Sequence, residues 1–338
     1  MAKVTFGDHS SAIVPRQNRA GSIHDTLSET EKFTQPCKES VMSPSASIEE
    51  HSLPATAPVD HNGVAHDMQN QSGARRQGFA AVHGLSMYYE IEGAGKPLVY
   101  IPMGFGVAGT TTFPALTQDR MLISLDLQGR GRTADIDRSL SYEQQADDVI
   151  ALLGHLKIDQ TDLLGECVGG IVAMLVAMRR PDLVRRVITY GTVFGQFHEA
   201  YKSEILAHVM SLTPGSEVLR FQRESYERVG PDPAHWPTIW DKFNRTQWHG
   251  FAPEDLGQVR APVLVAVGDQ DWVRLEHSLD SYRLFPKGEL AVIPDAGHFA
   301  LDSEQEKLLP LFEGFLNAPE TRLPFATTAF GYERGFSR

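Results

Sequence analysis

Cysteine is nearly missing from this chain of 338 residues, which has only two, Cys37 and Cys167. Two cysteines, one of them in a polar Ser-rich stretch, give no disulfide framework of the kind that small secreted domains need. No run of 18 apolar residues is present, so no transmembrane helix is expected. The N-terminus has basic residues without an apolar core and is not a secretory signal. We therefore expect a cytoplasmic protein.

Positive charge is also scarce. Lys and Arg number 31 against 43 Asp and Glu, and the formal net charge is −12. This balance argues against nucleic acid and against an anionic membrane surface as partners. The sequence contains no H-E-x-x-H, no paired C-x-x-C, no Walker-type G-K-[ST] and no G-x-G-x-x-G that opens a helix. We therefore expect no metal and no other cofactor, whereas the oligomeric state is not readable from the sequence.

The composition divides the chain into three parts. Residues 1–80 are polar and lack apolar periodicity, so they bury too little surface to offset chain entropy and are expected to be a disordered extension. Residues 82–318 alternate short apolar strands with amphipathic helices, and residues 319–338 form a C-terminal tail. Strands that alternate with helices predict an α/β fold, a mostly parallel twisted sheet flanked by helices.

The stretch GECVGG at residues 165–170 is the most informative motif of the chain. It follows a short apolar run at 161–164 and precedes a long one at 171–178, which predicts a strand, a sharp turn and a helix. This is the spacing of the G-x-S-x-G nucleophile elbow, with Cys167 in place of serine. Such a turn exposes the thiol at a helix N-terminus, where backbone N–H groups stabilise negative charge. Cys167 is therefore the candidate nucleophile, and a structural buried cysteine is the alternative.

Two more strand ends carry groups that suit such a nucleophile. A buried-strand pattern at 263–267 ends in Gly-Asp-Gln-Asp, and another at 289–294 leads to a Gly-His turn. A histidine on a loop suits a general base, and a carboxylate can orient its ring and stabilise the imidazolium. We therefore predict His298 as the base and Asp271 as the acid, with Asp269 as the competing carboxylate. The order nucleophile, acid, histidine is that of the α/β-hydrolase triad.

With these motifs in this order, residues 82–317 resemble the α/β-hydrolase superfamily, and its esterases and thioesterases in particular. The strand and loop at 98–106 and the segment DLQGRGRT at 126–133, which is similar to the family's D-x-x-G-x-G-x-S/T, extend the resemblance. It implies an α/β-hydrolase fold with a helical lid insertion at about 195–256. It also implies an oxyanion hole made by the backbone N–H groups of Phe105 and Val168. The sequence departs from the family at Met103, where histidine is usual, and at Cys167.

Four further residues are candidates for substrate binding or for tuning the charge of the thiol. Glu166 adjoins Cys167 and either raises the pKa of the thiol by like-charge repulsion, pairs with the imidazolium or a substrate group, or is an exposed or hydrogen-bonded turn residue. Met103 precedes the predicted oxyanion donor. Trp236 and Trp240 lie in the predicted lid, where they either line an acyl pocket or bury the lid against the core.

Two arginines near the predicted site have competing roles. Arg130 and Arg132 follow the fourth predicted strand and either bind a substrate carboxylate or hold the loop to Asp135 or Asp137.

Together, these features predict a cofactor-free hydrolase that cleaves a small acyl substrate, an ester or thioester, through a Cys-His-Asp triad and an acyl-Cys intermediate. The alternatives are an acyltransferase that uses the same acyl-enzyme, and a catalytically silent fold that binds a ligand or another protein.

Overall fold

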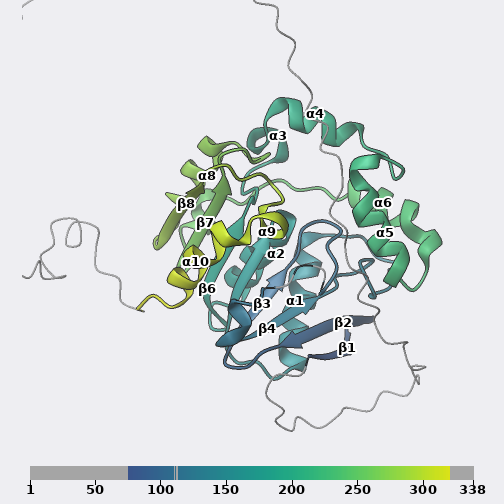
Figure 1. Cartoon of the computed structure of the whole chain (residues 1–338), viewed down its shortest axis with the longest axis horizontal. Coiled ribbons are helices and arrows are strands. Elements are labelled where there is room, and N and C mark those ends of the chain that lie inside the picture. The colour runs from purple at the N-terminus through teal and green to yellow at the C-terminus, as the bar shows by residue number, and fades with distance from the viewer. Residues whose placement is uncertain (1–74, 110, 112, 320–338) are drawn as a thin grey trace, which may run out of the picture. The chain divides into compact units, whose positions relative to one another are not determined.

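The computed structural model describes residues 75–109, 111 and 113–319. Residues 1–74 of the predicted N-terminal extension and residues 320–338 of the predicted tail lie outside this part. The described residues form an eight-stranded sheet in the order β1-β2-β4-β3-β5-β6-β7-β8, with helices around it (Figure 1). Strand β2 pairs antiparallel with β1 and β4, and every other neighbouring pair is parallel. The predicted mostly parallel sheet with flanking helices is therefore confirmed.

The strands and helices alternate along the chain. The strands are β1 (Arg76–Val82), β2 (Leu85–Glu92), β3 (Lys96–Ile101), β4 (Arg120–Leu125), β5 (Thr161–Glu166), β6 (Val184–Tyr190), β7 (Val263–Gly268) and β8 (Gly288–Ile293). The helices of the main layer are α1 (Tyr142–His155), α2 (Val168–Arg179), α8 (Leu275–Tyr282), α9 (Ala300–Ser303) and α10 (Gln305–Leu316), with the short 3-10 helix η1 (Leu116–Gln118).

Strand β1 starts before the predicted domain boundary at residue 82. It runs from Arg76 and pairs with β2 up to the Val82–Leu85 pair. The two turn residues, His83 and Gly84, have φ values of 45° and 85°, as a tight two-residue hairpin requires. The boundary differs because β1 lies at the sheet edge and its first residues are largely exposed, so no apolar alternation marks them in the sequence.

The central strands bury both of their faces. On one face Val99, Leu163 and Val187 pack into the core with α1 and α2. On the other face the neighbouring residues, such as Leu98 and Leu164, pack with α9 and α10. This alternation follows from the two-residue period of a strand. It also separates the two residues at the end of β5: Glu166 lies with the second face and Cys167 with the first.

The residues between β6 and β7 form the predicted helical insertion. It contains α3 (Phe197–Ala200), α4 (Ser203–Ser211), η2 (Glu217–Leu219), α5 (Arg220–Val229), η3 (Pro233–His235), α6 (Trp236–Asn244) and α7 (Pro253–Leu256). Figure 1 shows α3 to α6 gathered on one side of the sheet, away from α10. Several hydrogen bonds hold α6 in place. Among them, the Trp236 indole N–H donates to the Pro214 carbonyl at 2.8 Å, and the Lys242 ammonium donates to Asp135 at 2.7 Å. None of the helices in the described ranges combines the length and apolarity of a bilayer-spanning segment.

Candidate active site

Cys167 sits in the sharp turn between β5 and α2. Its φ of 51° and ψ of −120° lie outside the ordinary regions for an L-residue, and such a conformation costs about 1–3 kcal/mol. The glycines explain how the turn closes. A Cβ on Gly165 would lie 2.6 Å from the Gly169 carbonyl oxygen, and one on Gly169 would lie 2.2 Å from that of Ile101. The predicted strand, turn and helix are therefore present, with the thiol at the N-terminus of α2.

His298 and Asp271 meet beside this turn, although 27 positions separate them in the chain. The Nδ1 atom of His298 lies 2.7 Å from Oδ1 of Asp271, and both side chains are fully buried. Because the carboxylate can only accept, Nδ1 carries the proton and the Nε2 atom faces away from the acid. The Val273 N–H also donates to Oδ1 of Asp271, at 2.9 Å. The competing Asp269 is exposed and, among the described residues, accepts one long hydrogen bond, 3.4 Å, from the Ala296 N–H.

The electrostatics couple this histidine to the thiol. Nε2 of His298 has no hydrogen-bond partner within the described residues. Burial alone would lower the pKa of His298, but the negative charges of Cys167 and Asp271 outweigh it, so the pKa lies well above the usual value for histidine. The imidazolium form of His298 is therefore favoured. Cys167 itself is only 8 % exposed.

Two aromatic residues that the sequence does not mark as functional lie against Cys167 and His298. The Tyr201 hydroxyl lies 3.7 Å from the Cys167 sulfur. Trp272 stacks on the His298 ring with an interplanar angle of 8° and 4.4 Å between centroids. The segments that carry these two residues are joined by backbone contacts. Tyr201 forms an antiparallel β-bridge with Val273, and the Lys202 N–H donates to the Trp272 carbonyl at 3.0 Å. Trp272 follows Asp271 directly, and this adjacency is the only sequence signal for either residue.

The predicted oxyanion donors lie on two segments near the turn. Val168 is the first residue of α2, and Phe105 lies in a turn that the Gly106 N–H closes on the Met103 carbonyl at 2.8 Å. Within the described residues, neither the Phe105 nor the Val168 N–H donates a hydrogen bond. The Phe105 ring packs against the rings of Trp236 and Trp240, at centroid distances of 4.8 Å and 5.5 Å. The two tryptophans thus bury α6 against the loop that carries Phe105.

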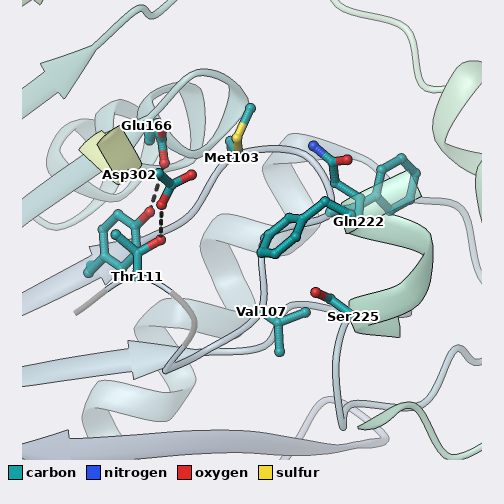
Figure 2. Close-up of a pocket in the computed structure, with 11 residues that line it drawn as sticks. Met103, Val107, Thr111, Glu166, Gln222, Ser225 and Asp302 are labelled. Atoms are coloured by element: carbon teal, nitrogen blue, oxygen red, sulfur yellow. Dashed lines mark hydrogen bonds between the residues drawn. The ribbon is translucent and has the colours of Figure 1, made fainter. Parts of the chain in front are cut away.

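Glu166 points away from the thiol, because neighbouring residues of a strand face opposite sides of the sheet. It is 1 % exposed, and its Oε2 accepts a bond of 2.7 Å from the Tyr100 hydroxyl. Burial, together with the negative charge of Asp302, raises the pKa of Glu166 to about 7. Figure 2 shows Glu166 and Asp302 near each other, with Met103 close by. Among the alternatives for Glu166, the hydrogen-bonded side chain is the one observed. The residue is buried, however, and its partner Tyr100 lies on β3.

Arg130 and Arg132 differ in their surroundings. Arg130 is 1 % exposed and donates one bond, at 2.9 Å, to Oε1 of Gln145, while its Nε and Nη2 have no partner in the described part. Burial lowers the pKa of Arg130 to about 10, against the opposing effect of Tyr142 and Cys167. Arg132 lies 3.7 Å from the Asp126 carboxylate.

The predicted attachment of these arginines to Asp135 or Asp137 is wrong. Asp135 instead makes hydrogen bonds to Lys242, His235 and Gln128. Among the residues that the structure describes, no group of three or more His, Cys, Asp or Glu side chains has the arrangement of a metal site.

Comparison with known proteins agrees with the fold. Residues 82–310 match the model of the Alpha/beta hydrolase family. Mouse serine hydrolase BPHL is 24 % identical over 230 residues, 64 % of this chain and 78 % of that protein. A RutD protein of Rhizobium rhizogenes is 30 % identical over 109 residues, 30 % of this chain and only 42 % of that protein. The solved structure of 2-hydroxy-6-oxo-6-phenylhexa-2,4-dienoate hydrolase from a Rhodococcus strain superposes with a TM-score of 0.60 at 18 % identity, covering 72 % of this chain and 99 % of that one. The chain is therefore a member of the α/β-hydrolase family.

Proposed function

We propose that this protein hydrolyses an ester or a thioester of a small acyl substrate, with Cys167 as nucleophile, His298 as general base and acid, and Asp271 as the residue that orients the ring. One observation carries the proposal: a strained, buried cysteine lies near a histidine that is hydrogen-bonded to a buried carboxylate at 2.7 Å. The other ring nitrogen of this histidine has no hydrogen-bond partner within the described residues. Family membership supports hydrolysis as the reaction type, and the finer assignment rests on these side chains.

The chemistry follows from the positions of the groups. Nε2 of His298 takes the proton of the Cys167 thiol, and the sulfur attacks the carbonyl carbon and forms a C–S bond. The negative charge moves to the carbonyl oxygen, where the Phe105 and Val168 N–H groups are the proposed donors. The oxyanion then collapses, the bond to the leaving alkoxide or thiolate breaks, and Nε2 of His298 gives that group its proton. In the second half, Nε2 takes a proton from water, which attacks the acyl-Cys and releases the acid and the thiolate.

The acyl-enzyme is the species to detect. The protein is mixed with a p-nitrophenyl ester or an acyl thioester, and the mass of the intact chain is followed with time. We expect one acyl group on Cys167 in the wild type and in Cys37→Ser, which removes the only other cysteine. Cys167→Ala should remain unmodified, and His298→Ala should acylate at least about 100-fold more slowly, the usual contribution of general acid–base catalysis.

The same experiment separates the alternatives. A folded wild-type protein whose Cys167 stays unmodified would refute the proposal and favour a silent binding fold. An acyl-enzyme that water clears slowly and an added alcohol or amine clears quickly would favour an acyltransferase.

A further inference from the structure

A small cavity lies beside the loop that carries Phe105, on the side of β5 to which Glu166 points. Its volume is about 30 Å³, room for a group of about two water-sized units. Figure 2 shows Glu166, Asp302 and Thr111 at one end, and Gln222 and Ser225, both from α5, at the other. Apolar side chains form much of the remaining wall: Met103, Phe105, Val107 and Phe221. Neither Cys167 nor His298 lines this cavity.

The unsatisfied polar atoms of this cavity are hydrogen-bond acceptors. Oε1 of Glu166 is buried and has no partner within the described residues, and the same holds for Oε1 of Gln222. Asp302 adds a second carboxylate at the exposed end, where the Thr111 hydroxyl donates to it at 2.5 Å. Among the described residues, no lysine or arginine lines the cavity. The buried Glu166 carboxylate is costly without a cationic partner in a largely apolar surrounding, so the site favours a ligand that is positively charged and donates hydrogen bonds.

We propose that this cavity binds the ammonium head of a small primary amine. An ammonium group is compact and has three donors, which can face the acceptors of Glu166 and Asp302 at one end of the cavity. A guanidinium is planar and has five donors, more than the acceptors here can satisfy, whereas a quaternary ammonium has no donor. A divalent metal ion requires more ligands than the two carboxyl groups and one amide present here. The apolar wall of Met103, Val107 and Phe221 suits the carbon chain that follows the head group.

The amine has two possible sources with the same chemistry. It is either part of the acyl substrate or a separate small amine. In both cases two wall residues belong to segments of the reacting centre, because Glu166 directly precedes Cys167 and Phe105 supplies the proposed oxyanion donor. Only the first source rests on the function proposed above; binding of an amine does not.

Binding is tested with ethylammonium chloride as the probe. Isothermal titration of the full-length wild-type protein at constant ionic strength should show saturable binding, and sodium chloride and ethanol should show none. Glu166→Gln and Asp302→Asn should each weaken ethylammonium binding about tenfold or more, the worth of a hydrogen bond to a charged group. Glu254→Gln, an exposed glutamate in the first turn of α7, is the matched control and should leave the dissociation constant unchanged.

The proposal is overturned if ethylammonium gives no saturable signal with the wild-type protein, as it would if the cavity held water alone. It is equally overturned if both Glu166→Gln and Asp302→Asn, with intact folds by circular dichroism, bind the probe as tightly as Glu254→Gln does.

A pair of thioester substrates then identifies the source of the amine. Their acyl chains have equal length and end in an ammonium or in a methyl group. A lower KM for the ammonium-ended substrate, lost in Glu166→Gln, assigns the amine to the substrate. No such preference, combined with a change in turnover of the methyl-ended substrate when ethylammonium is added, assigns it to a separate ligand. Turnover without ethylammonium binding would refute this proposal but not the proposed triad. Ethylammonium binding without turnover would refute the proposed triad but not the amine site.

Discussion

Replacement of Glu166 by glutamine should make the protein more stable above neutral pH. The folded-state pKa of Glu166, about 7, lies above the ordinary value of 4.5, so the folded chain holds the proton more tightly than the unfolded chain does. Stability from this group is therefore complete below about pH 4.5 and falls as the pH rises through the folded pKa. The separation between 4.5 and about 7 corresponds to roughly 3 kcal/mol, at about 1.4 kcal/mol for each pH unit.

Glutamine keeps an oxygen for the Tyr100 hydroxyl but has no charge to bury. Glu166→Gln should therefore exceed the wild type by up to about 3 kcal/mol in the free energy of unfolding at pH 8, with a much smaller difference near pH 4.5. Urea unfolding of both proteins across this pH range, in the absence of amines, measures the effect. Glu254→Gln controls for loss of an exposed glutamate and should follow the wild-type curve. Parallel curves for Glu166→Gln and the wild type would refute the claim that burial dominates the titration of Glu166.

Three other substitutions test the reacting centre. Asp271→Asn should lower kcat/KM for an activated ester by about 1,000-fold or more, because the His298 ring loses its orienting acceptor. Asp269→Asn is the control and should have little effect. Similar losses for both variants would contradict the assignment of the acid. Gly191→Ala places a Cβ 3.0 Å from Nδ1 of His298, at a residue whose φ is 58°. The melting temperature should therefore fall by an amount equivalent to about 1–3 kcal/mol, and esterase activity should drop. Gly154→Ala in α1, where a Cβ meets open space, is the control and should not destabilise the protein. Tyr201→Phe should slow acylation about 2- to 10-fold if its hydroxyl supports the thiolate 3.7 Å away, and an unchanged pH profile of acylation would count against that role.

The local conformations of this protein could be read from its sequence. The elbow at Cys167 depends on small residues that permit a tight strand-to-helix turn, and the pattern of apolar runs on either side is visible without a structure. The same holds for the strand ends before Asp271 and His298, because parallel strands place their carboxyl ends at one edge of the sheet. The β1 boundary was less readable, since an exposed edge strand is held by backbone hydrogen bonds that leave no side-chain pattern.

Contacts between distant segments were decided by the tertiary structure. The sequence by itself determined the order of the motifs that carry Cys167, Asp271 and His298 and hence the fold, because each motif encodes a local backbone geometry. It did not determine that Glu166 turns toward Tyr100, that Tyr201 reaches the sulfur of Cys167, or that Arg130 pairs with Gln145. Those outcomes depend on strand register and on how the insertion packs over the sheet, and both arise from the summed burial of many side chains rather than from any short pattern.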